Sequence, residues 1–151
     1  MKIFKYPNLI LRKKSKQLTS EEINNPKFKR LVLKMQKLMK KTDGAGLAAP
    51  QIGKNICLFA IDSKLYQTGY FINPILIERS IALNTAEEGC LSLPNIFGQV
   101  VRCNEIKIKF KNLENQNLVL TAEGLLARVI QQEMDHLDGV LFIDKMEGKQ
   151  N

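Results

Sequence analysis

Residues 121–142 read TAEGLLARVIQQEMDHLDGVLF, and this stretch has the pattern of a helix that carries a site. Its apolar residues recur at helical spacing and would lie on one helix face: Leu125, Leu126, Val129, Ile130 and Met134. We expect the helix to open at Ala122–Gly124, with Glu123 in the first turn, where the helix dipole favours a carboxylate. Asp138–Gly139 is a suitable stop. The stretch therefore predicts an amphipathic helix late in the chain.

The centre of this helix carries the polar cluster Gln132-Glu133-Met134-Asp135-His136. Positions 132 and 136 lie one above the other on one helix face. With histidine at 132 the cluster would read H-E-x-x-H, in which two imidazoles bind one metal. Here the first position is Gln132, and His136 is the only histidine in the chain. Taken alone, the cluster favours a polar helix face over a metal site, and only further motifs can reverse that order.

Length and composition restrict the class of protein. The 151 residues predict one domain, 1–151, with a single core. A hydrophobic content of 44% is typical of a folded globular chain, and no apolar run approaches the roughly 18 residues needed to cross a bilayer. Three scattered cysteines do not make a disulfide framework. We expect a cytoplasmic protein that does not enter a membrane.

The net charge of +8 is concentrated in the first 41 residues, which hold 13 Lys or Arg against two Glu. Such a basic segment could favour a polyanion such as ribosomal RNA. Few aromatic residues interleave with the lysines to stack on bases. The favoured interpretation is a solvated, lysine-rich helix face, without sequence-specific binding of nucleic acid.

Other elements are visible in the pattern of apolar residues. A helix is predicted from Pro26 to about Thr42, with proline at its first position and an apolar face after it. The predicted strands are Ile56–Ile61, Tyr70–Ile77, Ile81–Ala86, the alternating residues 106–111, and Leu118–Leu120 after a turn at 114–117. Asn73–Pro74 interrupts the second strand, because proline cannot lie inside a central ladder. This order of elements predicts an α+β fold.

A second polar stretch, Glu88-Gly89-Cys90-Leu91-Ser92, falls between predicted strands and is bounded by Pro94. Gly89 gives the backbone at Cys90 freedom, and Glu88 places a carboxylate two residues before the sulfur. Cys90 and His136 together would form a thiolate–imidazole site, soft enough for Fe(II), Zn(II) or Ni(II).

Three stretches resemble, in order and spacing, the signature motifs of peptide deformylases. They are GAGLAAPQ at 44–51, EGCLS at 88–92 and QEMDH at 132–136. The resemblance covers nearly the whole chain, including Ile72–Pro74, Val101–Arg102 and Glu123–Leu126. It implies antiparallel sheets packed around a central helix that carries Q-E-x-x-H. It also implies removal of the formyl group from N-formylmethionyl peptides.

The resemblance also implies a metal site. In that family Fe(II), replaceable by other divalent metals, is held by the cysteine of the second motif and both histidines of the third. Cys90 and His136 match two of these ligands, and Gln132 stands at the third position, where a neutral amide oxygen is a poor donor to a soft cation. Glu133 matches the general base. The Gln51 side-chain amide and the Leu91 backbone N–H match the donors to the developing oxyanion.

Further residues match supporting roles. Glu88 and Arg102 match an ion pair that braces the cysteine loop. Leu125 and Val129 match the apolar pocket for the methionine side chain. The peptide backbone would pair with the extended chain near Gly44 and Gly46, in the manner of strand addition.

Three functions stay open at this stage. The first is a metal-dependent deformylase that tolerates Gln132, and the second is a deformylase-like protein without catalysis that binds peptide N-termini. The third is a basic module associated with RNA or the ribosome. Many family members extend a C-terminal helix that can dock on the ribosome, whereas this chain has a short tail after Met146. Ribosome docking by that route is therefore not expected, and any ribosome contact is expected to be transient.

Overall fold

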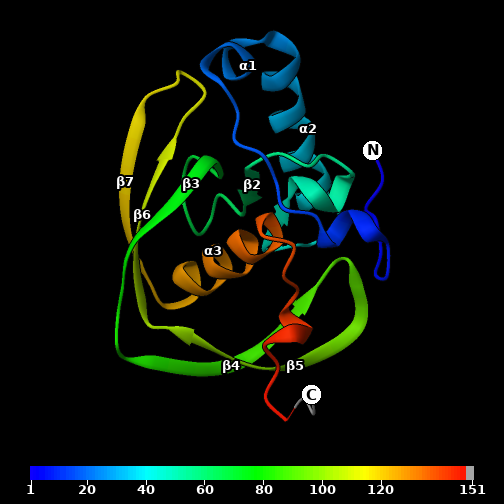
Figure 1. The fold of residues 1–151 in the computed structure, drawn as a ribbon, viewed down its shortest axis with the longest axis vertical. Helices are drawn as coiled ribbons and strands as arrows, with labels where there is room; N and C mark the ends of the chain where they lie inside the picture. Colours follow the sequence, from blue (N-terminus) through cyan, green and yellow to red (C-terminus); the bar gives the residue numbers. More distant parts are fainter. Residues whose placement is uncertain (149–151) are drawn as a thin grey trace.

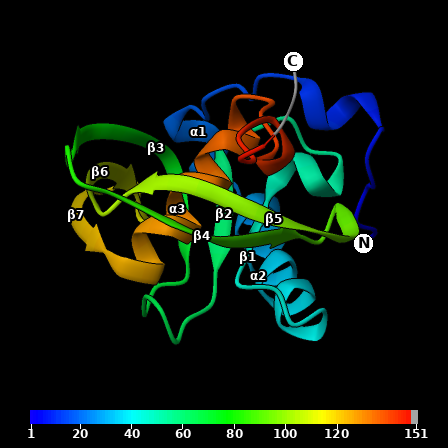
Figure 2. The same ribbon diagram turned by 90° about the horizontal axis from the view of Figure 1, so that it is seen from below.

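Helix α3 (Gly124–Leu137) runs through the middle of the molecule, with two antiparallel sheets around it (Figures 1 and 2). The structure is a computed structural model that describes residues 1–148. The larger sheet has the order β1-β2-β3-β6-β7, with the bounds Gly46–Ala48, Leu58–Ile61, Tyr70–Arg79, Glu105–Lys111 and Asn117–Glu123. The smaller sheet is a hairpin of β4 (Leu83–Cys90) and β5 (Leu93–Cys103). The predicted α+β class, with sheets around a central helix, is confirmed.

Two helices and three short 3₁₀ turns complete the described chain. The helices are α1 (Ser20–Asn24) and α2 (Pro26–Lys41), and the 3₁₀ turns are η1 (Leu9–Arg12), η2 (Ala49–Ile52) and η3 (Phe142–Asp144). No helix between residues 1 and 148 has the length and apolar character to span a membrane.

The apolar face of α3 explains its central position. Four of its side chains are buried in one cluster with the inward residues of the larger sheet: Ala127, Val129, Ile130 and Leu137. In that cluster Phe71 packs between Phe59 and Phe110, with ring centres 4.8 and 4.4 Å away. Aromatic pairs at such separations attract each other beyond the effect of the area they bury. The helix is therefore held in a fixed position against the sheet.

The predicted start of this helix is wrong by two residues. Ala122 and Glu123 belong to β7, whose ladder with β6 continues as far as the pair Glu105–Glu123. The chain turns into the helix only at Gly124, which has a φ of +61° that glycine adopts without strain. Pairing with β6 thus overrides the local helix signal. The predicted stop is confirmed, because Asp138 caps the helix and Gly139 has a φ of +73°.

The hairpin that carries Cys90 was only partly predicted. Strand β4 was expected at Ile81–Ala86 but extends to Cys90, so that Glu88–Cys90 is strand and not loop. Strand β5 was not predicted, and it begins with Leu93–Pro94. The two strands pair from Leu83–Cys103 to Cys90–Leu93. Most side chains of β5 are exposed, so no burial pattern in its sequence signals a strand.

Helix α2 agrees with the prediction. Asn25 caps its N-terminus by accepting a hydrogen bond from Lys27 N, and Pro26 occupies its first turn. Four residues of its apolar face are buried in a second cluster with residues of β1 and β2: Phe28, Val32, Met35 and Met39. The lysines and Arg30 lie outside this buried face. Helix α2 ends at Lys41, three residues before Gly44, which begins the motif stretch 44–51.

Asn73 ties the N-terminal segment to β3. The predicted interruption is present, because the register between β3 and β6 shifts between Ile72 and Ile75. Asn73 has a φ of +48°, and its side chain accepts a hydrogen bond from Leu18 N at 2.8 Å and donates one to Leu18 O at 2.7 Å. These bonds satisfy both backbone groups of a buried residue, as buried polar groups require.

Asn73→Ala should lower the free energy of unfolding by about 2–4 kcal/mol, because both backbone groups of Leu18 lose their partner. Urea unfolding measures the change. Asn95→Ala is the control, since Asn95 has a similar φ of +64° but is exposed. It should cost only the roughly 1–2 kcal/mol of the left-handed backbone. Equal losses in the two variants would show that the bonds to Leu18 contribute nothing.

Candidate active site

The three motif stretches meet at one cavity of about 380 Å³. Its lining includes Gly44 just before β1, Gly46 at the start of β1, Gln51 from η2, and Glu133 from α3. Cys90 and Leu91 reach it from the turn of the β4–β5 hairpin. Residues that are more than 80 positions apart in the chain therefore share one site.

Cys90 and His136 lie in contact beside this cavity. Cys90 Sγ is 3.4 Å from His136 Nε2. A sulfur and a nitrogen bound to one tetrahedral zinc ion, at the usual bond lengths, would be about 3.5 Å apart. The sulfur also accepts hydrogen bonds from Gln51 Nε2 and from Ser92 N, both at 3.4 Å. The distance and the donor types fit a divalent metal at two coordination positions.

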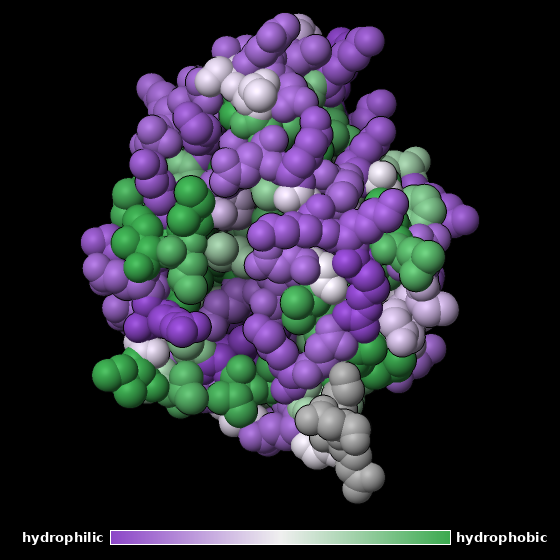
Figure 3. Space-filling view, in the orientation of Figure 1, coloured by the Kyte–Doolittle hydropathy of each residue, from purple (hydrophilic) through white to green (hydrophobic). Residues whose placement is uncertain are grey.

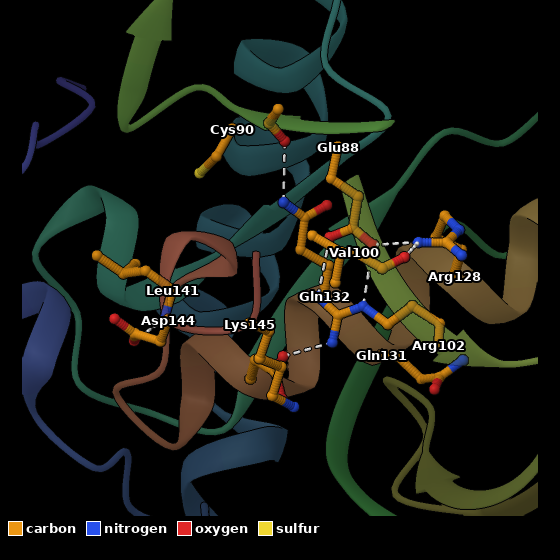
Figure 4. A network of polar contacts seen from close by, with 12 residues as sticks. Glu88, Cys90, Val100, Arg102, Arg128, Gln131, Gln132, Leu141, Asp144 and Lys145 are labelled. Atoms are coloured by element: carbon orange, nitrogen blue, oxygen red, sulfur yellow. Dashed lines mark hydrogen bonds and ion pairs between the residues drawn. The ribbon is translucent and has the colours of Figure 1, made fainter. Parts of the chain in front are cut away.

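Gln132 does not complete a set of three strong ligands. Its Nε2 donates a hydrogen bond to Gly89 O at 2.9 Å, as Figure 4 shows. Only the neutral amide oxygen is then left to face a cation, in place of an imidazole. Within residues 1–148, no three His, Cys, Asp or Glu side chains gather as a metal site. A metal here would depend mainly on Cys90 and His136.

Glu133 is a buried carboxyl group that is not fully hydrogen-bonded. Its side chain is 4% exposed, and Oε2 has no hydrogen-bond partner among the residues described. Gly46 makes room for it, because a Cβ there would lie 2.4 Å from Glu133 Oε1. Burial raises the pKa of Glu133 to about 8; Arg102 opposes the rise, while Glu88 and Asp135 add to it. A carboxyl group with this pKa can both accept and donate a proton near neutral pH.

Burial also shifts the two candidate ligands. It raises the pKa of the Cys90 thiol to about 12, and nearby Glu133 adds to the rise. It lowers the pKa of His136 to about 4, with Asp135 opposing the change. His136 Nδ1 also lacks a partner in the described part of the chain. A bound cation would favour the thiolate and the neutral imidazole, which are the forms that bind metals.

A buried charge network supports the cysteine side of the site (Figure 4). Glu88 accepts two hydrogen bonds from Arg102, both at 2.9 Å, and one from Arg128 at 2.6 Å. Arg102 also pairs with Asp135 at 2.5 Å. The predicted contact between Glu88 and Arg102 is present, whereas Arg128 was missed. Its signal in the sequence was a cation placed directly before Val129, on the apolar face of the helix.

The other candidate residues are placed as follows. Gln51 Oε1 accepts from Ala48 N at 2.8 Å, and Nε2 donates to Ser92 Oγ at 3.1 Å as well as to Cys90. Val129 lines the cavity, but Leu125 does not and is 60% exposed. Leu125 lies in the first turn of α3, and its assignment to the methionine pocket stays a prediction. Two lining residues, Lys5 and Phe97, had no motif to reveal them.

A buried carboxyl group beside a thiol–imidazole pair, in a cavity next to an edge strand, is the arrangement of a metal-dependent amide hydrolase. The comparisons define the family. The model of the family "Polypeptide deformylase" matches residues 1–151. The chain belongs to the polypeptide deformylase family.

Individual relatives agree over nearly the full length. The peptide deformylase of Borreliella burgdorferi is 41% identical over 99% of this chain and 89% of its own. The crystal structure of peptide deformylase from Thermotoga maritima is 37% identical and has a TM-score of 0.89, with 97% of each chain covered. A class I type b peptide deformylase from Acinetobacter baumannii, solved with Met-Ala-Ser bound, is 28% identical with a TM-score of 0.91 over 97% and 98% of the two chains.

Glu133→Gln should stabilise the metal-free protein increasingly as the pH rises from 5 to 8. The pKa of Glu133 is raised to about 8, so the folded state keeps a proton that the unfolded chain has lost. That difference lowers the stability of the unsubstituted protein through this pH range, and glutamine removes it. Thermal unfolding at pH 5, 6, 7 and 8 measures the change. The exposed Glu87→Gln is the control, and a constant Tm difference for Glu133→Gln would contradict the raised pKa.

Proposed function

We propose that this chain hydrolyses the N-formyl group from the N-terminal methionine of newly made polypeptides, with a divalent metal as cofactor. The observation that carries the proposal is Glu133, buried and unsatisfied, in the cavity beside Cys90 and His136. A divalent metal is expected in this family, and we propose Fe(II), with Zn(II) or Ni(II) able to replace it. The site of action would be the cytoplasm, where polypeptides are made.

Cys90 and His136 would hold the metal, with Gln132 as a weak third contact through its amide oxygen. When bound, the metal supplies the charge that makes water a nucleophile at neutral pH and polarises the formyl oxygen. Because an amide is a poorer donor than imidazole, this chain should bind the metal less tightly than a protein with histidine at position 132.

The remaining steps belong to the chain's own side chains. Glu133 would accept a proton from the attacking water and then give it to the leaving amine, so that formate and a free N-terminal amine are the products. The oxyanion on the formyl carbon would be stabilised by Gln51 Nε2 and by the backbone N–H of Leu91. Gln51 is held for this task, since its Oε1 is already bonded to Ala48 N.

The peptide would lie along β1. This strand pairs only with β2 among the described strands, so its other edge is open next to the cavity. An extended peptide can add to such an edge through backbone hydrogen bonds. The apolar side chains of Val129 and Leu91 suit an uncharged methionine side chain. The Met-Ala-Ser bound to the Acinetobacter protein begins with methionine, as the product of the proposed reaction would.

The decisive experiment is formate release from a formyl-methionyl tripeptide, with protein purified anaerobically and loaded with Fe(II) or Ni(II). We expect turnover that is lost with a chelator and restored by metal. Glu133→Ala should reduce kcat by about 10²–10⁴-fold, the contribution of a general base. Gln132→His should tighten metal binding by about tenfold or more, because it supplies a second imidazole.

The control for Gln132→His is Gln131→His, which adds the same imidazole one residue away. Gln131 bonds to both backbone groups of Cys103 and does not line the cavity, so this variant should bind metal no better than the unsubstituted chain. Metal content by mass spectrometry, measured beside activity, separates weak binding from weak catalysis. If only Gln132→His released formate, the proposed hydrolysis would be wrong, and the chain would be a binder of peptide N-termini.

A further inference from the structure

A basic groove lies between α2 and the N-terminal residues, apart from the cavity of the active site. It consists of two hollows of about 600 and 500 Å³ that share Met1, Lys34 and Lys54 in their lining. Seven cationic side chains line the groove: Lys2, Lys27, Arg30, Lys34, Lys37, Lys41 and Lys54. No Asp or Glu lines either hollow. The face that Figure 3 shows is also largely hydrophilic in its upper part, around α1, and most of α2 lies behind it.

The charges of this groove are not balanced within the described part of the protein. Helix α2 contains no acidic residue between Pro26 and Lys41. The ion pairs in residues 1–148 engage other cations, namely Arg12, Lys16, Arg102, Arg128 and Lys145. Like charges three or four residues apart on a helix repel each other. A bound polyanion would remove this repulsion.

The floor of the groove is apolar and contains two aromatic rings. Phe4, Leu38 and Ile52 line one hollow, and Phe28 and Leu31 line the other. Phe4 is held there by its backbone, since Phe4 N donates to Gln51 O at 2.7 Å. The ammonium group of Lys2 lies 5.8 Å from the centre of the Phe4 ring. The fold therefore brings the Phe4 ring, from a segment distant in the sequence, beside the lysines of α2.

We propose that this groove binds the phosphate backbone of RNA without sequence preference. Six of the seven cations are lysines, which bind phosphates as point charges. Those on α2 follow one another at three or four residues, about 5–6 Å apart, over a helix length of about 21 Å from Lys27 to Lys41. A regular row of one sign matches the regular charges of a nucleic acid strand, while the apolar floor can receive bases or sugars.

The choice of RNA as the polyanion rests on the proposed function. New polypeptides are attached to RNA while they are being made, so an enzyme that acts on them meets RNA at its substrate. Lys41 precedes Asp43 and Gly44 of the catalytic cavity by only two and three residues. RNA bound in the groove would therefore hold the cavity close to its substrates.

Fluorescence anisotropy with a labelled 20-nucleotide RNA of mixed sequence tests the groove directly. If about five phosphates are neutralised, the slope of log K against log salt is about −3.5 for a single strand. Affinity should then fall on the order of a hundredfold between 50 and 200 mM salt. Absence of binding by the unsubstituted protein at 50 mM salt would overturn the proposal.

The triple variant K34E/K37E/K41E should bind this RNA at least tenfold more weakly and with a shallower salt slope. Its matched control is K13E/K14E/K64E, which makes the same change in net charge at exposed lysines outside the groove and should lose less than threefold. Equal losses would mean that net charge alone attracts RNA, and tighter binding of a polyglutamate peptide than of RNA would mean an acidic protein partner. Either result overturns the proposal.

Formate release from a short formyl-peptide separates this proposal from the proposed function. The substituted lysines lie outside the catalytic cavity, so both triple variants should keep the activity of the unsubstituted chain. If K34E/K37E/K41E loses RNA binding but releases formate at an unchanged rate, the substitutions have affected the groove and not the catalytic site. RNA binding without any formate release would refute the catalytic proposal and leave the groove intact.

Discussion

The arrangement of the site depends on one buried carboxylate, Glu88, held between Arg102 and Arg128. All three side chains are almost fully buried, and such charges are tolerated only when each finds a partner. Arg128 belongs to α3, and it also donates to Val100 O on β5 and Asn84 O on β4. The β4–β5 hairpin forms no ladder with the larger sheet, so these contacts join it to the helix. Cys90, two residues after Glu88, thereby comes to lie against His136.

The same network makes an ionisable Glu133 tolerable. Burial alone penalises the charged carboxylate, and Arg102 is the group that lowers its pKa against that penalty. Arg102 is in turn neutralised by Glu88 and Asp135, so its effect on Glu133 is only partial. Glu133 Oε2 and His136 Nδ1 lack hydrogen-bond partners among the described residues, although both atoms are buried. A fold that keeps such costly groups at one cavity indicates a site maintained for chemistry and not for stability.

Features that are local in the sequence could be predicted, and features that depend on distant partners could not. The apolar spacing in residues 124–137 identified α3, and Asn73–Pro74 identified the irregularity in β3. The end of β7 was misassigned because its last pairs are made with residues almost 20 positions earlier. Arg128 and the aromatic floor of the basic groove were missed for the same reason, since each acquires its role from a segment far away in the chain.

Gln132 helps to hold the cysteine of the site in place. Histidine at this position could use one ring nitrogen for a metal and the other for a hydrogen bond that fixes the ring. Glutamine makes a hydrogen bond of the fixing kind, because Gln132 Nε2 donates to the carbonyl oxygen of Gly89, next to Cys90. The cysteine is thus still fixed from both sides, by Gln132 through Gly89 and by Gln51 through its sulfur. An amide oxygen is a weaker donor to a soft cation than an imidazole nitrogen. Under the proposed function, Gln132 would therefore limit metal affinity without disturbing the positions of Cys90, His136 and Glu133.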